Sequence, residues 1–479
     1  MDKKYLKKVD DLVWEIPTSY KDTMQVPARI IASETILENM DDGVFEQIIN
    51  VASLPGIQKS AYCMPDGHWG YGFPIGGVAA FDKETGVISP GGIGFDINCG
   101  MRLITTPLKK EEITSELKRL VDYLFKTVPA GVGTKGFVKI EDEEFEKVMT
   151  DGLKWAVDNG YGIKDDLDSA EENGRINFAD PTKVSDRARK RGRIQLGTLG
   201  SGNHYLEIQF VSEIFDEEKA KVMGIFKDQV VVMIHCGSRG FGHQIASDYL
   251  KVFEEKLDSY GIKVNDKQLA AVPFKSKEGQ DYYKAMACAA NMAFANRQVI
   301  THRVREAFNK IMNVPFEEMK LVYDVAHNIA KLEKHKVDGK VKELIVHRKG
   351  ATRSFGPGSE DLNPKFKKIG QPVILGGSME TGSYLLTGTK KAMELTFGST
   401  AHGSGRVMSR TQAKKQFTGE ELEKQMLKKG IYVKAVSMKG LAEEAGAAYK
   451  DIDTVIDAIQ KAGISNKVAS LKPLGNIKG

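Results

Sequence analysis

The fold of this chain is indicated first by residues 229–235, which read QVVVMIH. A run of apolar, mostly β-branched residues predicts a strand buried on both faces, and the histidine puts a polar side chain at its end. Three more runs have the same character, at residues 321–326, 341–346 and 372–375. Two of them are followed by His327 and His347, and the third runs into residues 376–379, which read GGSM. The four runs predict a sheet core that carries polar chemistry at the ends of its strands.

Helices are predicted between these strands. Residues 111–128 carry leucine, isoleucine and valine at helical spacing, and residues 282–312 form a long run without glycine or proline. Thr418 and Glu421 have the spacing of a capping box, which predicts that a third helix begins there. Short strands mixed with helices favour an α+β fold with mixed β-sheets.

No feature of the sequence divides the chain into separate units. There is no Pro/Ser-rich linker, no charge block and no repeat of fixed period. We therefore expect residues 1–479 to form one large compact domain. Residues 164–193, where acidic and basic residues are mixed, are the candidate surface insertion.

Composition bounds the class of protein. Hydrophobic residues make up 41% and charged residues 28%, which excludes a disordered or fibrous chain. The net charge of +5 is compatible with a polyanionic partner but does not identify one. Residues 1–11 lack the apolar core of a signal peptide, and no run approaches the roughly 20 apolar residues of a membrane span. We expect a cytoplasmic protein without a membrane segment.

Cysteine usage indicates neither a disulfide framework nor a zinc knuckle, because no two cysteines have paired spacing. One of them, Cys99, lies three positions after Asp96 in a glycine-flanked turn, residues 94–100, which read GFDINCG. A carboxylate and a thiolate could bind a metal there. Alternatively, Cys99 is a small core residue and Asp96 a turn residue, and the pair alone leaves both interpretations open.

Three histidines extend this candidate metal site. His204, His235 and His327 each neighbour glycine or asparagine at or near a predicted strand, where a rigid sheet could hold neutral imidazole ligands. Together with Asp96 and Cys99 they offer five oxygen, nitrogen and sulfur donors. A structural zinc needs fewer, whereas two divalent ions sharing a bridging thiolate would use all five.

A fourth histidine has the surroundings of a nucleophile. His402 lies in residues 401–410, which read AHGSGRVMSR, so small neighbours would let a bulky anion approach the imidazole. An unprotonated imidazole can attack a phosphate, and Arg406 and Arg410 could neutralise neighbouring phosphates. The alternative from this segment alone is a loop histidine in a turn beside two arginines.

These strings, in this order, resemble the archaeal-type members of the RtcB family of RNA-splicing ligases. The likeness rests on GFDINCG, GNH, HxGSRG, AHN and AHGxGRxMSR and runs from about residue 64 to the C-terminus. One position departs from the family pattern, because Cys236 stands where a hydroxyl residue is usual, which adds a thiol near the expected metals. The resemblance implies the RtcB-type fold and a single catalytic domain.

The resemblance also implies a GTP- and manganese-dependent site. Two Mn²⁺ ions would bind per chain, with Cys99 bridging, Asp96 and His204 completing one ion, and His235 and His327 the other. His402 would be the catalytic residue that accepts GMP from GTP. Tyr449 would stack on the base, while Glu207 and Lys478 would read guanine. The implied GTP- and GMP-binding residues are Asn203, His204, Tyr205, Leu206, Glu207, His327, Asn328, Gly376, Gly377, Ser378, Met379, Ser383, His402, Gly403, Ser404, Gly405, Tyr449 and Lys478.

The implied activity joins RNA 2′,3′-cyclic phosphate or 3′-phosphate ends to 5′-hydroxyl ends through a histidine–GMP intermediate. Arg239 and Arg410 would contact the RNA-end phosphate, and Arg348 and Arg353 would line the same pocket. The substrates would be tRNA halves in splicing and broken RNA in repair, the partner an archease-type activating protein, and the enzyme a monomer. Two other functions fit the residues: a dinuclear metal-dependent phosphoesterase, and a non-catalytic RNA-end-binding protein. Dependence on GTP separates the ligase from the first, and turnover separates it from the second.

Overall fold

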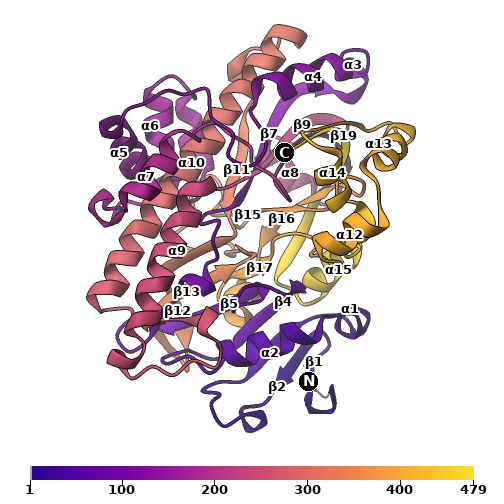
Figure 1. The fold of residues 1–479 in the computed structure, drawn as a ribbon. Coiled ribbons are helices and arrows are strands. Elements are labelled where there is room, and N and C mark those ends of the chain that lie inside the picture. The colour runs from indigo at the N-terminus through magenta and orange to yellow at the C-terminus, as the bar shows by residue number, and fades with distance from the viewer. Residues whose placement is uncertain (1–2) are drawn as a thin grey trace.

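Two large sheets form the centre of the computed structural model, which describes residues 3–479 (Figure 1). The first sheet has the strand order β1-β2-β3-β4-β5-β13-β12. Its strands are β1 Lys7–Asp10, β2 Val13–Ile16, β3 Ala28–Ile31, β4 Ala61–His68, β5 Ile75–Asp82, β13 Lys340–Lys349 and β12 Asn328–Val337. Neighbouring strands are antiparallel except for the parallel pair β3 and β4, so the sheet is mixed.

The second sheet has the order β11-β7-β9-β8-β19-β16-β15, with β18 beside β19 in parallel. Its strands are β11 Leu321–Ala326, β7 Gly100–Lys109, β9 Gln229–Cys236, β8 Tyr205–Ile214, β19 Ser465–Lys478, β16 Ser383–Gly388, β15 Pro372–Gly376 and β18 Tyr432–Ala435. Two small ladders pair β6 Val87–Ile88 with β10 Val272–Pro273, and β14 Ala351–Arg353 with β17 Ser399–Ala401. The predicted α+β class with mixed sheets is confirmed.

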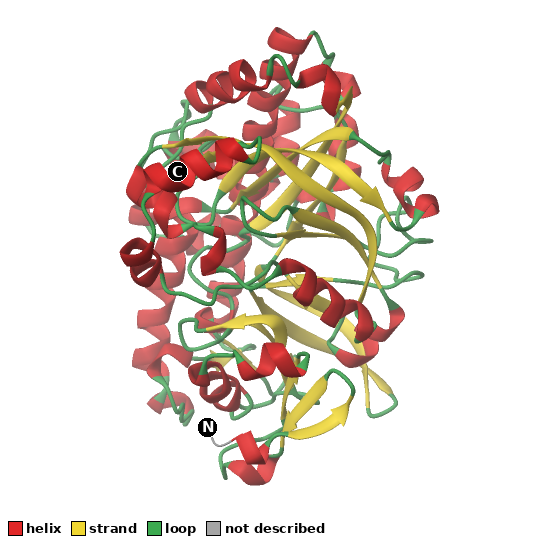
Figure 2. Cartoon of the chain, turned by 90° about the vertical axis from the view of Figure 1, so that its right-hand side faces the viewer, coloured by secondary structure: helices red, strands yellow, loops and turns green. Residues whose placement is uncertain are grey.

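Helices pack on two sides of the strands (Figures 1 and 2). One group, on the left in Figure 1, contains α5 Asp142–Asp151, α6 Leu153–Asp158, α7 Asp186–Arg193, α9 Arg239–Lys256 and the long α10 Lys277–Met312. The C-terminal group, on the right, contains α12 Arg410–Gln416, α13 Gly419–Lys428, α14 Met438–Glu443 and α15 Ile452–Lys461. The others are α1 Glu34–Glu38, α2 Asp42–Val51, α3 Lys110–Ile113, α4 Leu117–Thr127, α8 Glu217–Met223 and α11 Lys390–Leu395. Among residues 3–479, no helix is both long enough and apolar enough to cross a membrane.

The predicted helices are present, with two changes in their limits. The run at 282–312 belongs to α10, which begins earlier because the Ser276 hydroxyl accepts a hydrogen bond from the Gly279 N–H. Thr418 caps α13 as expected, accepting from the Glu421 N–H. The prediction of one helix over residues 111–128 is wrong, because a turn separates α3 from α4. In this turn the Glu116 N–H donates to the Ile113 carbonyl.

The predicted strands are also present, but His347 is not at a strand end. It lies inside β13, opposite Ala79 of β5 and Ala330 of β12. Its ring packs edge-on against Phe81, and Nε2 accepts the Ser89 N–H at 3.2 Å. Burial lowers the pKa of His347 to about 3. This histidine is therefore a neutral core residue, and the expectation of polar chemistry there is corrected.

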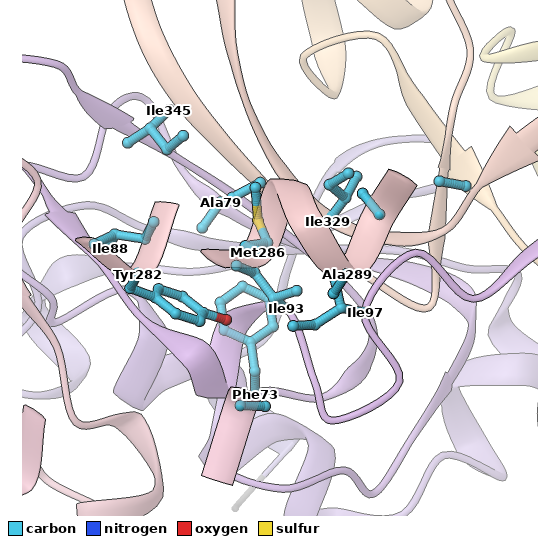
Figure 3. Packing of buried hydrophobic residues seen from close by; sticks show 14 of the residues in the cluster. Phe73, Ala79, Ile88, Ile93, Ile97, Tyr282, Met286, Ala289, Ile329 and Ile345 are labelled. Atoms are coloured by element: carbon cyan, nitrogen blue, oxygen red, sulfur yellow. The ribbon is translucent and has the colours of Figure 1, made fainter. Parts of the chain in front are cut away.

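The largest apolar cluster holds the loop that carries Asp96 and Cys99. Ile93 and Ile97 of this loop pack against Met286 and Ala289 of α10, with Phe73 close by (Figure 3). Both isoleucines are fully buried. Burying one such side chain contributes on the order of 2 kcal/mol, so the loop is anchored on either side of Asp96.

Candidate metal and nucleotide site

The turn at residues 94–100 brings Asp96 and Cys99 together. Gly94 and Asn98 have φ values of 92° and 54°, a left-handed backbone that glycine and asparagine tolerate best. The Cys99 N–H bonds to the Asp96 carbonyl at 3.0 Å, and the Asn98 side chain donates to the Ala290 carbonyl of α10 at 2.7 Å. The turn is thus fixed from both sides.

Five side chains converge at the end of this turn. The Cys99 Sγ lies 3.3 Å from His204 Nε2 and 3.2 Å from His235 Nε2. His235 Nε2 lies 3.3 Å from His327 Nε2, and His204 Nε2 lies 2.8 Å from Asp96 Oδ2. The donors form two groups, Asp96–Cys99–His204 and Cys99–His235–His327, and the ligand atoms within each lie within 4.8 Å of one another. Cys99 belongs to both groups, which is the arrangement of a thiolate shared by two cations.

The electrostatics of these groups suit cations. Burial, with the charge of His204, holds the pKa of His235 well below its ordinary value, and burial with the charge of His402 does the same for His327. Burial would raise the pKa of Asp96, but His204 outweighs it and the pKa falls to about 2. Neutral imidazoles and an ionised carboxylate offer lone pairs, and Asp96 Oδ1 is buried without a hydrogen-bond partner in the described structure.

One contact sets the orientation of the His235 imidazole, and a main-chain hydrogen bond ties His327 to Cys99. His235 Nδ1 lies 3.0 Å from the Asn203 carbonyl, so Nδ1 carries the proton and Nε2 directs its lone pair at Cys99. The His327 N–H donates to the Cys99 carbonyl at 2.9 Å. The main chain therefore holds the ligands as a rigid group. The Cys99 thiol has its pKa raised well above the ordinary value by burial and then by Asp96, so a bound cation would be needed to keep it ionised.

His402 stands beside this cluster, and its partner is Asp66. His402 Nδ1 lies 2.6 Å from Asp66 Oδ2, and the same oxygen accepts the backbone N–H groups of His402 at 3.0 Å and Gly403 at 3.3 Å. The His402 ring is 4.8 Å from the ring of His327, centroid to centroid. Since Nδ1 donates to the carboxylate, Nε2 keeps its lone pair.

Asp66 is a site residue that sequence reasoning missed. It is fully buried, and burial would raise its pKa, but the charge and hydrogen bonds of His402 hold that pKa below its ordinary value. The only local signal is its place in residues 64–68, which read MPDGH. Two glycines permit the approach: a Cβ at Gly405 would collide with the Asp66 carbonyl, and one at Gly350 would lie 3.2 Å from the His402 ring.

A cavity of about 240 Å³ opens on the cluster and on His402. The structure brings most predicted residues to its wall: Asp96, Cys99, Asn203, Tyr205, His235, His327, Asn328, Gly376, Gly377, Ser378, Met379, His402, Gly403, Ser404, Gly405, Arg410, Tyr449 and Lys478. Arg406, expected to neutralise phosphates, is on the wall too. The wall also includes residues that the sequence did not single out for the nucleotide: His68, Ile75, Met101, Gly350, Glu444 and Asn476.

Five predicted residues lie behind or beside this wall: His204, Leu206, Glu207, Arg239 and Ser383. Leu206 is buried in an apolar cluster. Glu207 accepts hydrogen bonds from Gln209 and from Asn476, so Asn476 stands between this carboxylate and the cavity. Burial raises the pKa of Glu207 to about 7. Ser383 is bonded to Gln209 at 3.1 Å. His204 lies in the donor cluster, against Cys99 and Asp96.

Arg239 lies at the ligand cluster rather than in the nucleotide cavity. Its guanidinium donates to Thr198 Oγ1 and to the Gly131 carbonyl, both at 3.2 Å. A Cβ at Gly200 would collide with both Arg239 and His204, so the two side chains flank this glycine. Arg410, on the other hand, lines the cavity with its side chain 52% exposed, 3.7 Å from Glu443.

A polar network lines another part of the cavity wall. Its members are Arg406, Glu444, Tyr449 and Lys478. Tyr449 donates to Glu444, accepts from Arg406 at 2.9 Å, and has its ring 4.8 Å from that guanidinium. Lys478 lies at the end of β19, where Nζ is 3.5 Å from Glu444 and 5.3 Å from the centre of the Tyr205 ring. The last strand therefore places the penultimate lysine at the cavity.

Two arginines expected in this pocket are corrected to structural roles. Arg348 is 1% exposed and donates two hydrogen bonds to Glu333, at 2.6 and 2.8 Å. Arg353 is 3% exposed and pairs with Glu171 at 3.1 Å and Glu172 at 2.8 Å. Both guanidinium groups are neutralised by buried carboxylates, which the sequence motif around them does not reveal.

Cys236 lies next to the cluster in the chain but does not join it. Its thiol donates to the Leu199 carbonyl at 2.9 Å and receives the Asn296 side-chain N–H at 3.2 Å. It belongs to neither group of clustered donors. The thiol therefore braces α10 against the loop before His204 and does not extend the ligand set.

The chain is similar to known proteins of one family. The family model described as "tRNA-splicing ligase RtcB" matches residues 47–479. A tRNA-splicing ligase RtcB of Methanococcus maripaludis is 55% identical over 479 residues, covering 100% of both chains. One of Thermococcus kodakarensis is 53% identical, covering 99% of both. An "RNA-splicing ligase RtcB homolog 1" of Entamoeba dispar is 48% identical, covering 97% of this chain and 89% of the relative.

Proposed function

Because the chain belongs to the RtcB family of tRNA-splicing ligases, we propose that it is an RNA ligase acting in tRNA splicing. It would join RNA 2′,3′-cyclic phosphate or 3′-phosphate ends to 5′-hydroxyl ends, with GTP as cosubstrate. The observation that carries this proposal is the Asp66–His402 pair beside a two-group donor cluster. A phosphoesterase would need the metals but no oriented nucleophile.

The cofactor would be two Mn²⁺ ions per chain. Asp96 and His204 would hold one, His235 and His327 the other, and Cys99 both. The mixed carboxylate, imidazole and thiolate donors and the orphaned Asp96 oxygen fit divalent cations, while the choice of manganese comes from the family resemblance. When bound, the ions would supply Lewis-acid stabilisation of phosphate oxygens.

The first step would be guanylation of His402. Its Nε2 lone pair attacks the α-phosphate of GTP, an N–P bond forms, and the bond to the leaving pyrophosphate breaks with its electron pair. Asp66 keeps the Nδ1 proton in place and offsets the positive charge that the imidazole acquires. The small residues at 376–378 and 403–405 line the cavity, so the phosphates could approach the backbone there at low steric cost.

The guanine end would lie against Tyr449 and Lys478. Tyr449 offers an aromatic face, and Lys478 an ammonium donor for the guanine O6 acceptor. Glu207 would act on the base's donor edge with Asn476, whose amide it binds. We assign Leu206 and Ser383 supporting positions under this wall, since Ser383 bonds to Gln209 beside Glu207.

The steps on RNA would also be displacements at phosphorus. A cyclic phosphate is first opened by water to a 3′-phosphate, which takes GMP from His402. The 5′-hydroxyl of the second RNA attacks that phosphate, and GMP leaves. In an in-line displacement the attacking and leaving groups are on opposite sides. Since GMP leaves toward His402, we propose that the 5′-hydroxyl strand enters past Arg239 and His204, and that Arg410 contacts the 3′-phosphate end.

We extend the proposal to the setting of the reaction. The substrates would be tRNA halves, and broken RNA in repair, in the cytoplasm. Residues 1–479 would act as one catalytic domain and as a monomer, with an archease-type activating protein as partner. The segment 164–193 would be a surface insertion held by the buried Asp166–Arg305 and Glu171–Lys331 pairs.

A ligation assay tests this function. Two RNA oligonucleotides, one with a 2′,3′-cyclic phosphate and one with a 5′-hydroxyl, are incubated with the protein and Mn²⁺ in the presence of GTP, ATP or no nucleotide. Joining with GTP alone supports the ligase. Release of inorganic phosphate or opened ends without nucleotide and without joining would instead support a phosphoesterase.

A further inference from the structure

Lys450 is a half-buried cation that does not touch the cavity directly. Its Nζ donates to the Pro65 carbonyl at 2.9 Å and to the Gly67 carbonyl at 2.6 Å. Among residues 3–479 no carboxylate lies within ion-pair distance of this ammonium. Main-chain carbonyl groups therefore stabilise its charge. The backbone N–H of Lys450 donates to the Gly405 carbonyl at 2.9 Å.

The two carbonyls that Lys450 binds flank Asp66. The Pro65 carbonyl belongs to the peptide group that precedes Asp66, and the Gly67 carbonyl belongs to the peptide group that follows Gly67. Holding the chain at these two points restricts the direction of the Asp66 Cα–Cβ bond. Asp66 Oδ2 accepts three hydrogen bonds from residues 402–403, and this needs the carboxylate to approach from one direction. By holding the chain before and after Asp66, the Lys450 ammonium sets that direction.

The ammonium also acts on the Asp66 charge. Burial would raise the pKa of Asp66; His402 lowers it most, and the charge of Lys450 lowers it further. Burial lowers the pKa of Lys450 itself, and the charge of Asp66 opposes this. Two groups therefore favour the ionised form of this carboxylate, the His402 imidazole that donates to it and the nearby Lys450 ammonium.

We propose that Lys450 is a positioning residue for guanylation: it clamps residues 65–67 of β4 so that Asp66 holds the His402 imidazole with Nε2 toward the α-phosphate. Because Lys450 follows Tyr449 in the chain, the same backbone joins the nucleotide wall to the support of the nucleophile. The inference rests on the proposed function, since it assumes that His402 accepts GMP.

The test compares Lys450→Met with Lys461→Met, a matched change at an exposed lysine of α15. GMP transfer to the protein is followed by intact mass over time at several GTP concentrations. Lys450→Met should lower the rate at saturating GTP by roughly tenfold or more, with half-saturation changed by less than about twofold, because orientation and not binding is lost. Lys461→Met should behave as the wild type. An unchanged maximal rate, or a change in half-saturation alone, overturns the proposal.

Two further measurements separate positioning from a general loss of structure. RNA supplied with a 3′-terminal diphosphate-linked guanosine bypasses His402, so Lys450→Met should still join it to a 5′-hydroxyl end at near wild-type rate; an equal loss in both reactions contradicts the proposal. In the Asp66→Ala background Lys450→Met should cause no further loss, because it acts through Asp66. If the two substitutions instead lower the guanylation rate by factors that multiply, Lys450 does not act through Asp66 and the proposal is overturned.

Lys450→Arg keeps the charge and the donors, and it should recover part of the guanylation rate even if the methionine variant folds poorly. No recovery in a folded arginine variant counts against the clamp. If wild-type protein gains no GMP, the proposed function fails; if it gains GMP and Lys450→Met gains it equally fast, only this inference fails.

Discussion

The carboxylate of Asp66 and the imidazole of His402 meet at 2.6 Å, although 336 positions separate them in the chain. Asp66 comes from the end of the first sheet and His402 from the segment after β17, so folding itself assembles the pair. The contact gives the imidazole one defined tautomer, with the free nitrogen beside the donor cluster. Four consequences of this site and its surroundings can be measured, together with the identity of the nucleophile itself.

Asp66→Asn should slow GMP transfer to the protein by roughly 10²–10⁴-fold, because an amide neither balances the charge on the imidazole nor fixes its tautomer. The rate is measured by intact mass with GTP and Mn²⁺, and bound metal is measured in parallel. Since Asp66 is outside both donor groups, metal content should not change. A rate within about twofold of the wild type would contradict the orienting role.

Cys99→Ala should lower the occupancy of both metal positions, whereas His327→Ala should lower mainly one, because only Cys99 belongs to both donor groups. Metal analysis of the purified variants gives the ratio of metal to chain. Cys236→Ala is the matched control: its thiol is buried nearby but bonded to Leu199 and Asn296, so its metal content should equal the wild type. Full metal content in Cys99→Ala would show that the thiolate does not bridge.

GTP should be preferred over ATP, since adenine reverses the hydrogen-bond roles that Lys478 and the Glu207–Asn476 pair offer to guanine. Each buried group left unpaired costs roughly 1–3 kcal/mol. Glu207→Gln should reduce the preference, while Ser212→Ala, farther along β8, should not. The readout is the rate of adduct formation with each nucleotide. Equal rates with GTP and ATP in the wild type would remove the base-reading roles.

Arg348→Met should destabilise the protein rather than weaken RNA binding. Breaking a buried ion pair by removing one partner costs about 3–5 kcal/mol, and Glu333 would lose both hydrogen bonds to the guanidinium. Burial would raise the pKa of Glu333, but Arg348 holds it far below its ordinary value of 4.5. The stability from this pair is therefore fully present above that ordinary pKa and is lost as pH falls below it.

Thermal unfolding at pH 7 and pH 4 measures this effect. At pH 7 the melting temperature of Arg348→Met should lie well below that of the wild type. At pH 4 the difference between the two melting temperatures should be smaller. If the melting temperature is unchanged and the RNA concentration at half-saturation is raised, Arg348 contacts RNA and the structural role is wrong.

The sequence predicted the parts of the site whose chemistry is local. His204 and His327 each stand beside an asparagine at a strand end, and His235 lies two positions before Gly237. Cys99 lies three positions after Asp96, so short motifs suffice to find all four. The strands and α10 were predictable for the same reason, since their apolar runs are continuous.

What the sequence could not predict depends on distant partners. Nothing near Asp66 points to His402, and nothing near Arg348 or Arg353 points to the carboxylates that neutralise them. His347 was misplaced because the end of β13 is set by pairing with β5, where Lys349 still faces Gly77. The break between α3 and α4 likewise follows a local hydrogen bond of Glu116 that helical periodicity does not encode.

The central claim is that His402 is the guanylated nucleophile. Wild-type protein and His402→Ala are incubated with GTP and Mn²⁺, and the mass adduct is mapped by peptide analysis under conditions that preserve a phosphoramidate. The account predicts one GMP on His402 in the wild type and none in the variant. The variant should keep its metals, because His402 is outside both donor groups, and should still join RNA that already carries an activated 3′ end. An adduct on a lysine or on another histidine would contradict the account, even if the protein ligates RNA with GTP.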